Sequence, residues 1–234
     1  MRPVDRGPIP QINGKDIEYS CYQNAKRDLT ERLGDYCSYC EMQLSAGLAI
    51  EHVQPKSKQP GRECQWDNFL LACPNCNSTK RDKEINDSNI NDYLWPDKDN
   101  TFYSFIYTED GEVRANPEHS PIIQQKANAM IQLVGLNKNP GNAVKASDLR
   151  WKDRLDAWGK ATRAKQRLST VAPACSSVMR AQIEDTANSH FSIWLTVFSD
   201  DPDMCRRLIR KFKGTATNCF NPDGKPIPRE GGQI

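Results

Sequence analysis

Apolar residues recur at helical spacing on both sides of a central segment that lacks such a repeat. After Ser20, they mark one face of a predicted helix that ends at Gly34, namely Tyr22, Ala25, Leu29 and Leu33. Residues 1–19 are rich in Pro and Gly, so we expect them to run extended over the surface. Downstream, helical patterns predict helices over 120–137, from Ser147 onward, over 177–198 and over 203–213.

Two of the downstream patterns define helix faces. In the first, the face consists of Ile122, Ala129, Leu133 and Leu136, and the breaker Asn139-Pro140-Gly141 follows it. In the second, Trp151, Leu155 and Trp158 form an apolar stripe at i, i+4 and i+7. We expect the first helix to pack against the core.

The central segment has the pattern of short strands. Leu48 to Val53 is an apolar run that contains a charged and titratable pair, and Pro55 stops it. Pro74 is suited to the first turn of a helix that continues through the polar run to Glu84. Further on, Asp110-Gly111 between two apolar runs, 101–107 and 112–115, predicts a hairpin.

These elements predict an α+β protein with three regions. Residues 1–36 hold an extended segment and a helix, and residues 37–116 hold a compact core with a hairpin. Residues 117–234 are helical, and we expect them to bind a partner. The longest apolar run, 193–198, is far too short to cross a bilayer, so we expect no membrane association.

Charge and cysteine content narrow the picture. The formal net charge is +2, so any surface that binds phosphate must be local. The best candidate is 150–167, where basic residues far outnumber acidic ones, although such a run is more often a solvated helix face. Nine cysteines, an odd number, suggest a reducing cytoplasm rather than a disulfide framework.

Four of the cysteines form two Cys-x-x-Cys pairs, Cys37/Cys40 and Cys73/Cys76. Two such pairs complete an all-thiolate tetrahedral shell with no open position, which is how structural Zn²⁺ is held. The alternative, a set of buried reduced thiols, would not require the paired spacing. Zinc at this position would fix the helix that follows Cys73 and orient Asn77 and Lys80, which are three residues apart on one face.

The segment between the cysteine pairs carries further motifs. Glu51-His52-x-x-Pro55, then Asn68, then Cys-x-x-Cys-Asn77-x-x-Lys80 resembles the zinc-containing form of the HNH endonuclease family. The resemblance implies a ββα-metal finger with a catalytic divalent ion.

That resemblance also assigns roles to the residues. It implies that His52 is the general base, that Glu51 and Asn77 bind Mg²⁺ or Mn²⁺, and that Asn68 braces the loop between the strands. Asn77 stands where the family often has His, so the chain resembles an H-N-N variant, with ligands that suit a hard ion.

Phosphodiester hydrolysis needs a base, an in-line water and neutralisation of charge on the phosphate. A neutral imidazole suits the first task near pH 7. Lys80, with Lys56 and Arg81 nearby, is the candidate for electrostatic stabilisation of the phosphate. Because adjacent strand residues point to opposite faces, Glu51 and His52 are expected to address one phosphate only if the strand is irregular there.

A closer resemblance extends over roughly residues 28–107. The stretches DLTERLGDYCSYCEMQL, AIEHVQPKSKQP, CQWDNFLLACPNCNSTK and YLWPDKDNTFYSFIY are similar to the HNH subunit of Septu-type and retron-associated anti-phage systems. That resemblance implies a complex with an ABC-type ATPase. In retron versions it also implies a reverse transcriptase and its RNA–DNA hybrid.

The sequence therefore predicts a metal-dependent endonuclease that acts on nucleic acid. DNA is the default substrate, and RNA, including tRNA, stays open. The alternative is a zinc-stabilised adaptor that recruits the ATPase or binds nucleic acid without cutting it. The two hypotheses predict different results for His52→Ala, because adaptor function would survive the loss of this side chain and nuclease function would not.

Overall fold

The computed structural model describes residues 1–139, 141 and 148–234 and has the predicted α+β fold. Its helices are α1 (Lys26–Leu33), α2 (Pro74–Lys80), α3 (Thr101–Ser104), α4 (Pro121–Val134), α5 (Arg150–Thr170), α6 (Ser176–Thr186), α7 (Phe191–Val197) and α8 (Pro202–Lys211). Its strands form antiparallel pairs, β1 (Gln11–Ile12) with β2 (Lys15–Asp16), β3 (Ala49–His52) with β4 (Phe69–Ala72), and β5 (Phe105–Tyr107) with β6 (Val113–Ala115).

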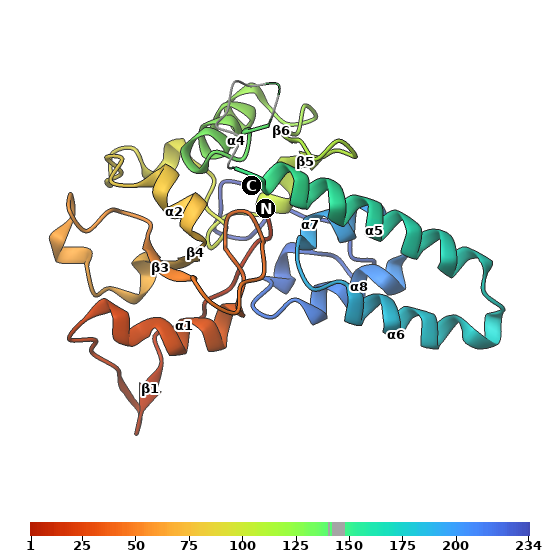
Figure 1. The fold of residues 1–234 in the computed structure, drawn as a ribbon. Helices are drawn as coiled ribbons and strands as arrows, with labels where there is room; N and C mark the ends of the chain where they lie inside the picture. The colour runs from red at the N-terminus through yellow and green to blue at the C-terminus, as the bar shows by residue number, and fades with distance from the viewer. Residues whose placement is uncertain (140, 142–147) are drawn as a thin grey trace.

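The central ββα unit consists of β3, β4 and α2. Four consecutive residue pairs join the strands, from Ala49 opposite Ala72 to His52 opposite Phe69. Pro74 opens α2 immediately after β4, as expected for a residue that lacks an N–H. Figure 1 shows this unit at one side of the molecule, with α5 and α6 extending to the other.

The N-terminal segment lies partly inside the protein, which corrects the expectation of a surface course for residues 1–19. Met1 and Val4 are fully buried, and Val4 forms an antiparallel bridge with Thr215. The guanidinium of Arg2 donates hydrogen bonds to the backbone oxygens of Leu33 and Lys213. The segment is therefore held between α1 and the end of the chain.

The predicted first helix has two parts. A 3₁₀ turn over Tyr22–Ala25 precedes α1, which ends at Gly34 with a positive φ of 75°. Leu29 and Leu33 are buried as the spacing indicated. Cys21 occupies the N-cap position of the 3₁₀ turn, and its side chain forms no capping hydrogen bond.

Two clusters of buried apolar side chains stabilise the fold. The first joins the ββα unit to the N-terminal segment, β5, β6 and α4. The second joins the inner faces of α5 to α8 with Tyr36 and Phe220. Helix α4, which lies in the region predicted to bind a partner, thus packs with the ββα unit.

Helix α4 and the hairpin before it appear at the predicted places with differences in detail. Ser120 caps α4, and Gly135 ends it in the left-handed conformation at φ 69°. Of the predicted face, Leu133 and Leu136 are buried, Ala129 is half-buried and Ile122 is 65% exposed. The buried residues of α4 itself are Ala127, Met130, Ile131, Leu133 and Val134, so its buried face is shifted in part from the predicted one. The hairpin pairs β5 with β6, but Thr101–Ser104 is helical because the side chain of Asn100 caps that turn.

The single helix predicted over 177–198 is two helices. The helical conformation is interrupted between α6 and α7, where His190 has a φ of 54° in the left-handed region. The last predicted helix is present as α8, opened by Asp201 and Pro202. The expected helix start at Ser147 lies outside the described residues.

Helix α5 is oriented differently from the expectation based on its tryptophans. Its buried face consists of Arg150, Arg154, Ala157 and Ala161, while Leu155 is exposed and both tryptophans are only half-buried. Two members of the basic run therefore point into the protein. Within the described residues, no helix combines the length and apolar character that a membrane span requires.

Candidate functional site

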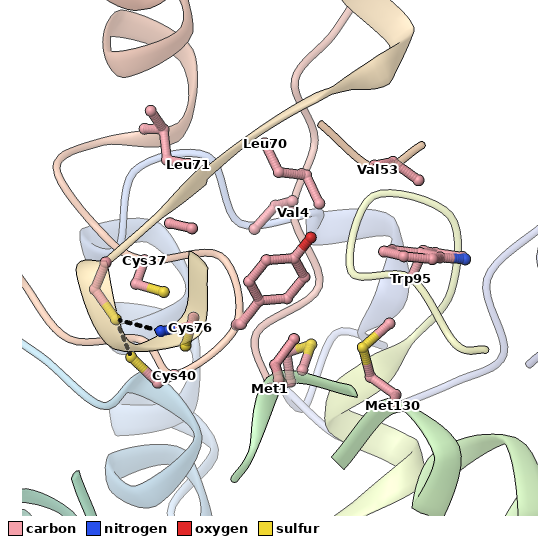
Figure 2. Close-up of a cluster of buried hydrophobic side chains, with 14 of the residues drawn as sticks. Met1, Val4, Cys37, Cys40, Val53, Leu70, Leu71, Cys76, Trp95 and Met130 are labelled. Carbon is pink, nitrogen blue, oxygen red and sulfur yellow. Dashed lines mark hydrogen bonds between the residues drawn. The ribbon is translucent and has the colours of Figure 1, made fainter. Parts of the chain in front are cut away.

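Four cysteine thiols converge at the base of the ββα unit. Cys37 and Cys40 lie in the loop before β3, Cys73 caps α2, and Cys76 lies in the first turn of that helix. All four are buried, and their sulfur atoms lie within 4.8 Å of one another. Figure 2 shows Cys37, Cys40 and Cys76 grouped beside the buried side chains of the first cluster.

This geometry fits Zn²⁺. Tetrahedral coordination with bonds of about 2.3 Å places sulfur atoms about 3.8 Å apart. The Sγ atoms of Cys40 and Cys73 are 3.6 Å apart. Because four thiolates leave no open position, zinc here would stabilise the fold and take no part in hydrolysis.

Backbone contacts hold the cysteine loop on the strand pair. The amide of Ser38 donates to the carbonyl of Leu71 over 2.8 Å, and the amide of Leu71 donates to the Ser38 hydroxyl over 3.2 Å. The residue after the first pair, Glu41, adopts a positive φ of 65°, and its amide donates to Cys37 O. The loop is thereby anchored to β4 in the absence of any covalent link.

His52 is the last residue of β3, and its ring lies between two aromatic side chains. The ring of Tyr22 contacts it edge to face at 4.9 Å between centroids, and that of Phe69 does so at 5.4 Å. Its Nε2 lies 2.9 Å from the backbone oxygen of Glu63. Since a carbonyl only accepts, Nε2 must carry the proton, and in the neutral ring Nδ1 keeps a free electron pair.

The environment of His52 favours this neutral form. Burial lowers the pKa of His52 below its usual 6.5, and the charges of Lys56 and Lys80 act in the same direction. The hydrogen bond to Glu63 O opposes this shift only in part. A neutral imidazole with an unprotonated Nδ1 can accept a proton from water.

Glu51 points away from His52 and toward α2. Its carboxylate lies 2.6 Å from the ammonium of Lys80, and both side chains are buried. The Lys80 ammonium also donates to the backbone oxygen of His52 over 2.7 Å. Burial raises the pKa of Glu51 and lowers that of Lys80, so each charge depends on the other.

The position of Lys80 differs from the expected one. Its side chain has no exposed surface, so in this structure it makes no contact with a phosphate outside the protein. Instead, it ties α2 to β3 through Glu51 and the His52 carbonyl. The expected irregularity of β3 is also absent, because pairing continues through His52 and Val53.

Asn68 holds the loop that joins β3 to β4. Its Oδ1 accepts from the amide of Gln54 over 2.8 Å, and its Nδ2 donates to the backbone oxygens of Gln54 and Arg62 over 3.0 and 3.1 Å. Arg62 directly precedes Glu63, whose carbonyl accepts the hydrogen bond from Nε2 of His52. Asn68 and His52 therefore fix the same turn of the loop from two sides.

Asn77 is half-buried on α2, one turn before Lys80 and on the same face. No side-chain hydrogen bond of Asn77 is found among the described residues. Glu51 and Asn77 thus come from a strand and a helix that pack together, and a carboxylate with an amide suits Mg²⁺ or Mn²⁺. The donors fit such an ion in chemistry, and in this structure the Lys80 cation is bound to the carboxylate.

Three features of the site lie outside the sequence-based expectations. Tyr22 packs on His52, the Glu63 carbonyl fixes its tautomer, and Arg150 donates to Cys76 Sγ over 3.0 Å. Arg150 was part of a basic run, and nothing in that run distinguishes buried arginines from solvated ones. The other two contacts depend on loop conformation, which the motif spacing does not encode.

Comparison with known proteins supports an HNH nuclease at this site. Residues 37–83 match the family model described as HNH endonuclease. The match contains both cysteine pairs, the ββα unit and all five of the residues proposed for catalysis, and it indicates a metal-dependent nuclease domain. No curated protein matches the chain.

Proposed function

We propose that this protein is a metal-dependent HNH endonuclease that hydrolyses phosphodiester bonds with His52 as general base. The observation that carries the proposal is the orientation of His52, whose Nε2 is held by the Glu63 carbonyl so that Nδ1 is the basic atom. This orientation occurs inside the segment that matches the HNH family. Any buried imidazole N–H needs an acceptor, so the feature that suits a general base is Nδ1, for which no hydrogen-bond donor is found among the described residues.

In the proposed reaction, Nδ1 of His52 takes a proton from a water molecule. The water oxygen forms a bond to phosphorus, and one P–O ester bond breaks. A divalent ion would supply charge neutralisation on the phosphate, with Asn77 as a ligand. Glu51 would join it as a ligand on the same phosphate only after its carboxylate leaves Lys80 and β3 departs from its regular pairing. Lys56, which is exposed and lies over the Tyr22 ring beside His52, is better placed than Lys80 to approach the phosphate.

The biological setting belongs to the same proposal. The similarity over residues 28–107 supports a role as effector subunit of an anti-phage complex with an ABC-type ATPase, joined in retron versions by a reverse transcriptase and its RNA–DNA hybrid. DNA is the favoured substrate, with tRNA and other RNA as further candidates. A reducing cytoplasm agrees with nine cysteines that are all free thiols.

The test is cleavage of plasmid DNA and total tRNA by the purified protein, alone and with its ATPase, in Mg²⁺ or Mn²⁺. We expect His52→Ala to lose at least about 10²-fold in rate, as for removal of a general base, and Asn77→Ala to lose activity through weaker ion binding. His119→Ala is the matched control, because His119 is a half-buried histidine outside the site.

Two outcomes would contradict the proposal. Equal cleavage by the native protein and His52→Ala would assign the activity to another residue or to a contaminant. Failure of the native protein to cut either substrate, with the ATPase and Mn²⁺ present, would favour the adaptor hypothesis.

A further inference from the structure

The seven basic side chains of α5 fall into two groups. Four are engaged within the protein. Arg150 and Arg154 are buried and donate to backbone carbonyls, Lys152 pairs with Asp156, and Lys165 bonds Asp200 and the Val197 carbonyl. The other three, Lys160, Arg163 and Arg167, are exposed and form no ion pair with any described residue.

These three cations share one face of α5. Their positions at i, i+3 and i+7 place them in a row, which a rise of about 1.5 Å per residue extends over about 10 Å. The acidic residues of the same helix, Asp153 and Asp156, lie one to two turns before Lys160. Asp156, one turn before Lys160 on the same face, is therefore an acidic neighbour at the start of the row, although it also pairs with Lys152. Toward Arg167 the row has no further carboxylate on α5.

The row lines a groove between α5 and α6 with a volume of about 290 Å³. Helix α6 contributes the neutral polar side chains Gln182 and Thr186, and the apolar part of the lining is Ala164, Met179 and Ile183. No carboxylate is among these lining residues. Figure 1 shows the joined ends of α5 and α6 projecting at one side of the molecule.

We propose that this groove binds the phosphodiester backbone of nucleic acid, as an anchor separate from the ββα unit. The proposal rests on the nuclease function proposed above. A row of about 10 Å is comparable to three or four consecutive phosphates of one strand, which are spaced about 3.4 Å along the axis. Arginine and lysine bind phosphate oxygens, and the side-chain amide of Gln182 adds a neutral hydrogen-bond donor, whereas the Thr186 hydroxyl donates to the Gln182 backbone oxygen over 2.8 Å.

The groove favours a polyanion with regular charges over an acidic protein. Its three cations and the Gln182 amide are donors that suit any phosphate, and its apolar part, with Met179 and Ile183, is small. A stable protein interface would need a larger apolar core. Contacts to phosphate alone carry no sequence information, so the groove would hold the substrate without selecting a sequence.

The test compares two full-length triple variants in the His52→Ala background, where cleavage does not compete with binding. The first is Lys160→Gln, Arg163→Gln and Arg167→Gln. The control is Arg210→Gln, Lys211→Gln and Lys213→Gln, which removes the same charge at and beyond the end of α8. Binding of labelled single-stranded DNA, duplex DNA and tRNA is measured by fluorescence anisotropy over a range of salt concentrations.

We expect the groove variant to bind at least about tenfold more weakly near 0.1 M salt, and the slope of log K against log salt to fall by about 2. The control should retain the slope of the parent. A groove variant that keeps the nucleic-acid affinity and the salt slope of the parent would overturn the proposal. The same holds if that variant instead loses the binding of an acidic protein.

Cleavage by the same triples with His52 intact separates this proposal from the nuclease function. If the native protein cuts and the groove variant binds and cuts equally well, the groove proposal alone fails. If the native protein binds through the groove and cuts nothing, the groove stands and the nuclease function fails. If it neither binds nor cuts, both fail.

Discussion

Arg150 donates a hydrogen bond to the Sγ of Cys76 over 3.0 Å, from the first turn of α5 to the first turn of α2. The same guanidinium donates to the carbonyls of Val134 and Gly135, both over 2.9 Å, at the end of α4. Its charge is balanced by Asp148 at 2.8 Å. One side chain thus connects the cysteine cluster to two helices of the C-terminal half.

Removal of this side chain should weaken both zinc binding and the fold. Four thiolates on Zn²⁺ carry a net charge of −2, which the guanidinium partly offsets. Arg150→Met removes the donor to two buried carbonyls and the nearer cation of Asp148, which keeps Lys138 at 3.8 Å, so we expect a loss of about 2–3 kcal/mol in the free energy of unfolding and faster release of zinc to a chelator. Chemical denaturation and a colorimetric zinc assay measure the two effects.

The neighbouring variant Lys152→Met serves as its control. Lys152 is exposed, and its pair with Asp156 is at the surface and screened by solvent, so its loss should leave the free energy of unfolding close to that of the native protein. Equal zinc release from both variants and the native protein would show that Arg150 does not support the cluster.

Lys80→Met should destabilise the protein even without substrate. It leaves the Glu51 carboxylate buried without a cation, which costs about 3–5 kcal/mol. Adding Glu51→Gln in the same chain should restore part of that loss, because no buried charge then remains. A double-mutant cycle of unfolding free energies measures the coupling. If Lys80 acted only on the phosphate, Lys80→Met would unfold like the native protein and lose activity alone.

The pH dependence of cleavage should report His52. The base must be neutral, and burial lowers its pKa, so kcat/KM should rise with pH, reach half its plateau below pH 6.5 and stay flat above. Lys56→Gln removes a positive charge that lowers this pKa, so the midpoint should move to higher pH. The chain has only three histidines, so an NMR titration with His52→Ala as reference identifies the ring directly. If the midpoint of the pH profile does not move in Lys56→Gln, the titrating group is not His52.

His190 should make the fold sensitive to acid. Burial lowers its pKa from 6.5 to about 4, which means that the folded state favours the neutral ring. The resulting stabilisation is fully present above pH 6.5 and is lost as the pH falls toward 4. His190→Asn tolerates the left-handed backbone and has no charge to gain, so its unfolding free energy should depend less on pH in that window. If the unfolding free energy of His190→Asn depends on pH as steeply as that of the native protein, the acid sensitivity comes from other groups.

The sequence predicted the parts of the fold that depend on local chemistry. The spacing of Cys37, Cys40, Cys73 and Cys76 predicted their cluster because two such pairs close on one ion, and Pro74 marked the start of α2. The break at His190 was missed, since a left-handed residue that is neither Gly nor Asn gives no signal in the hydrophobic pattern.

Long-range pairing was beyond the sequence. The burial of Arg150 and Lys80 depends on partners on other elements, and their charge predicted a place at the surface. The shifted face of α4 has the same cause, because the position of the ββα unit decides which residues of α4 are covered. Which neighbours Glu51 and His52 meet on the two sides of β3 required the register with β4.

The bridge between Val4 and Thr215 has a consequence for synthesis of the protein. A ribosome delivers the chain from its N-terminus, so Val4 cannot form this bridge until more than 200 further residues, through Thr215, have been made. Arg150 likewise reaches Cys76 only after the ββα unit has left the ribosome. During translation the unit therefore lacks two of its supports, and a nascent chain would present an incompletely braced nuclease to the nucleic acids around it.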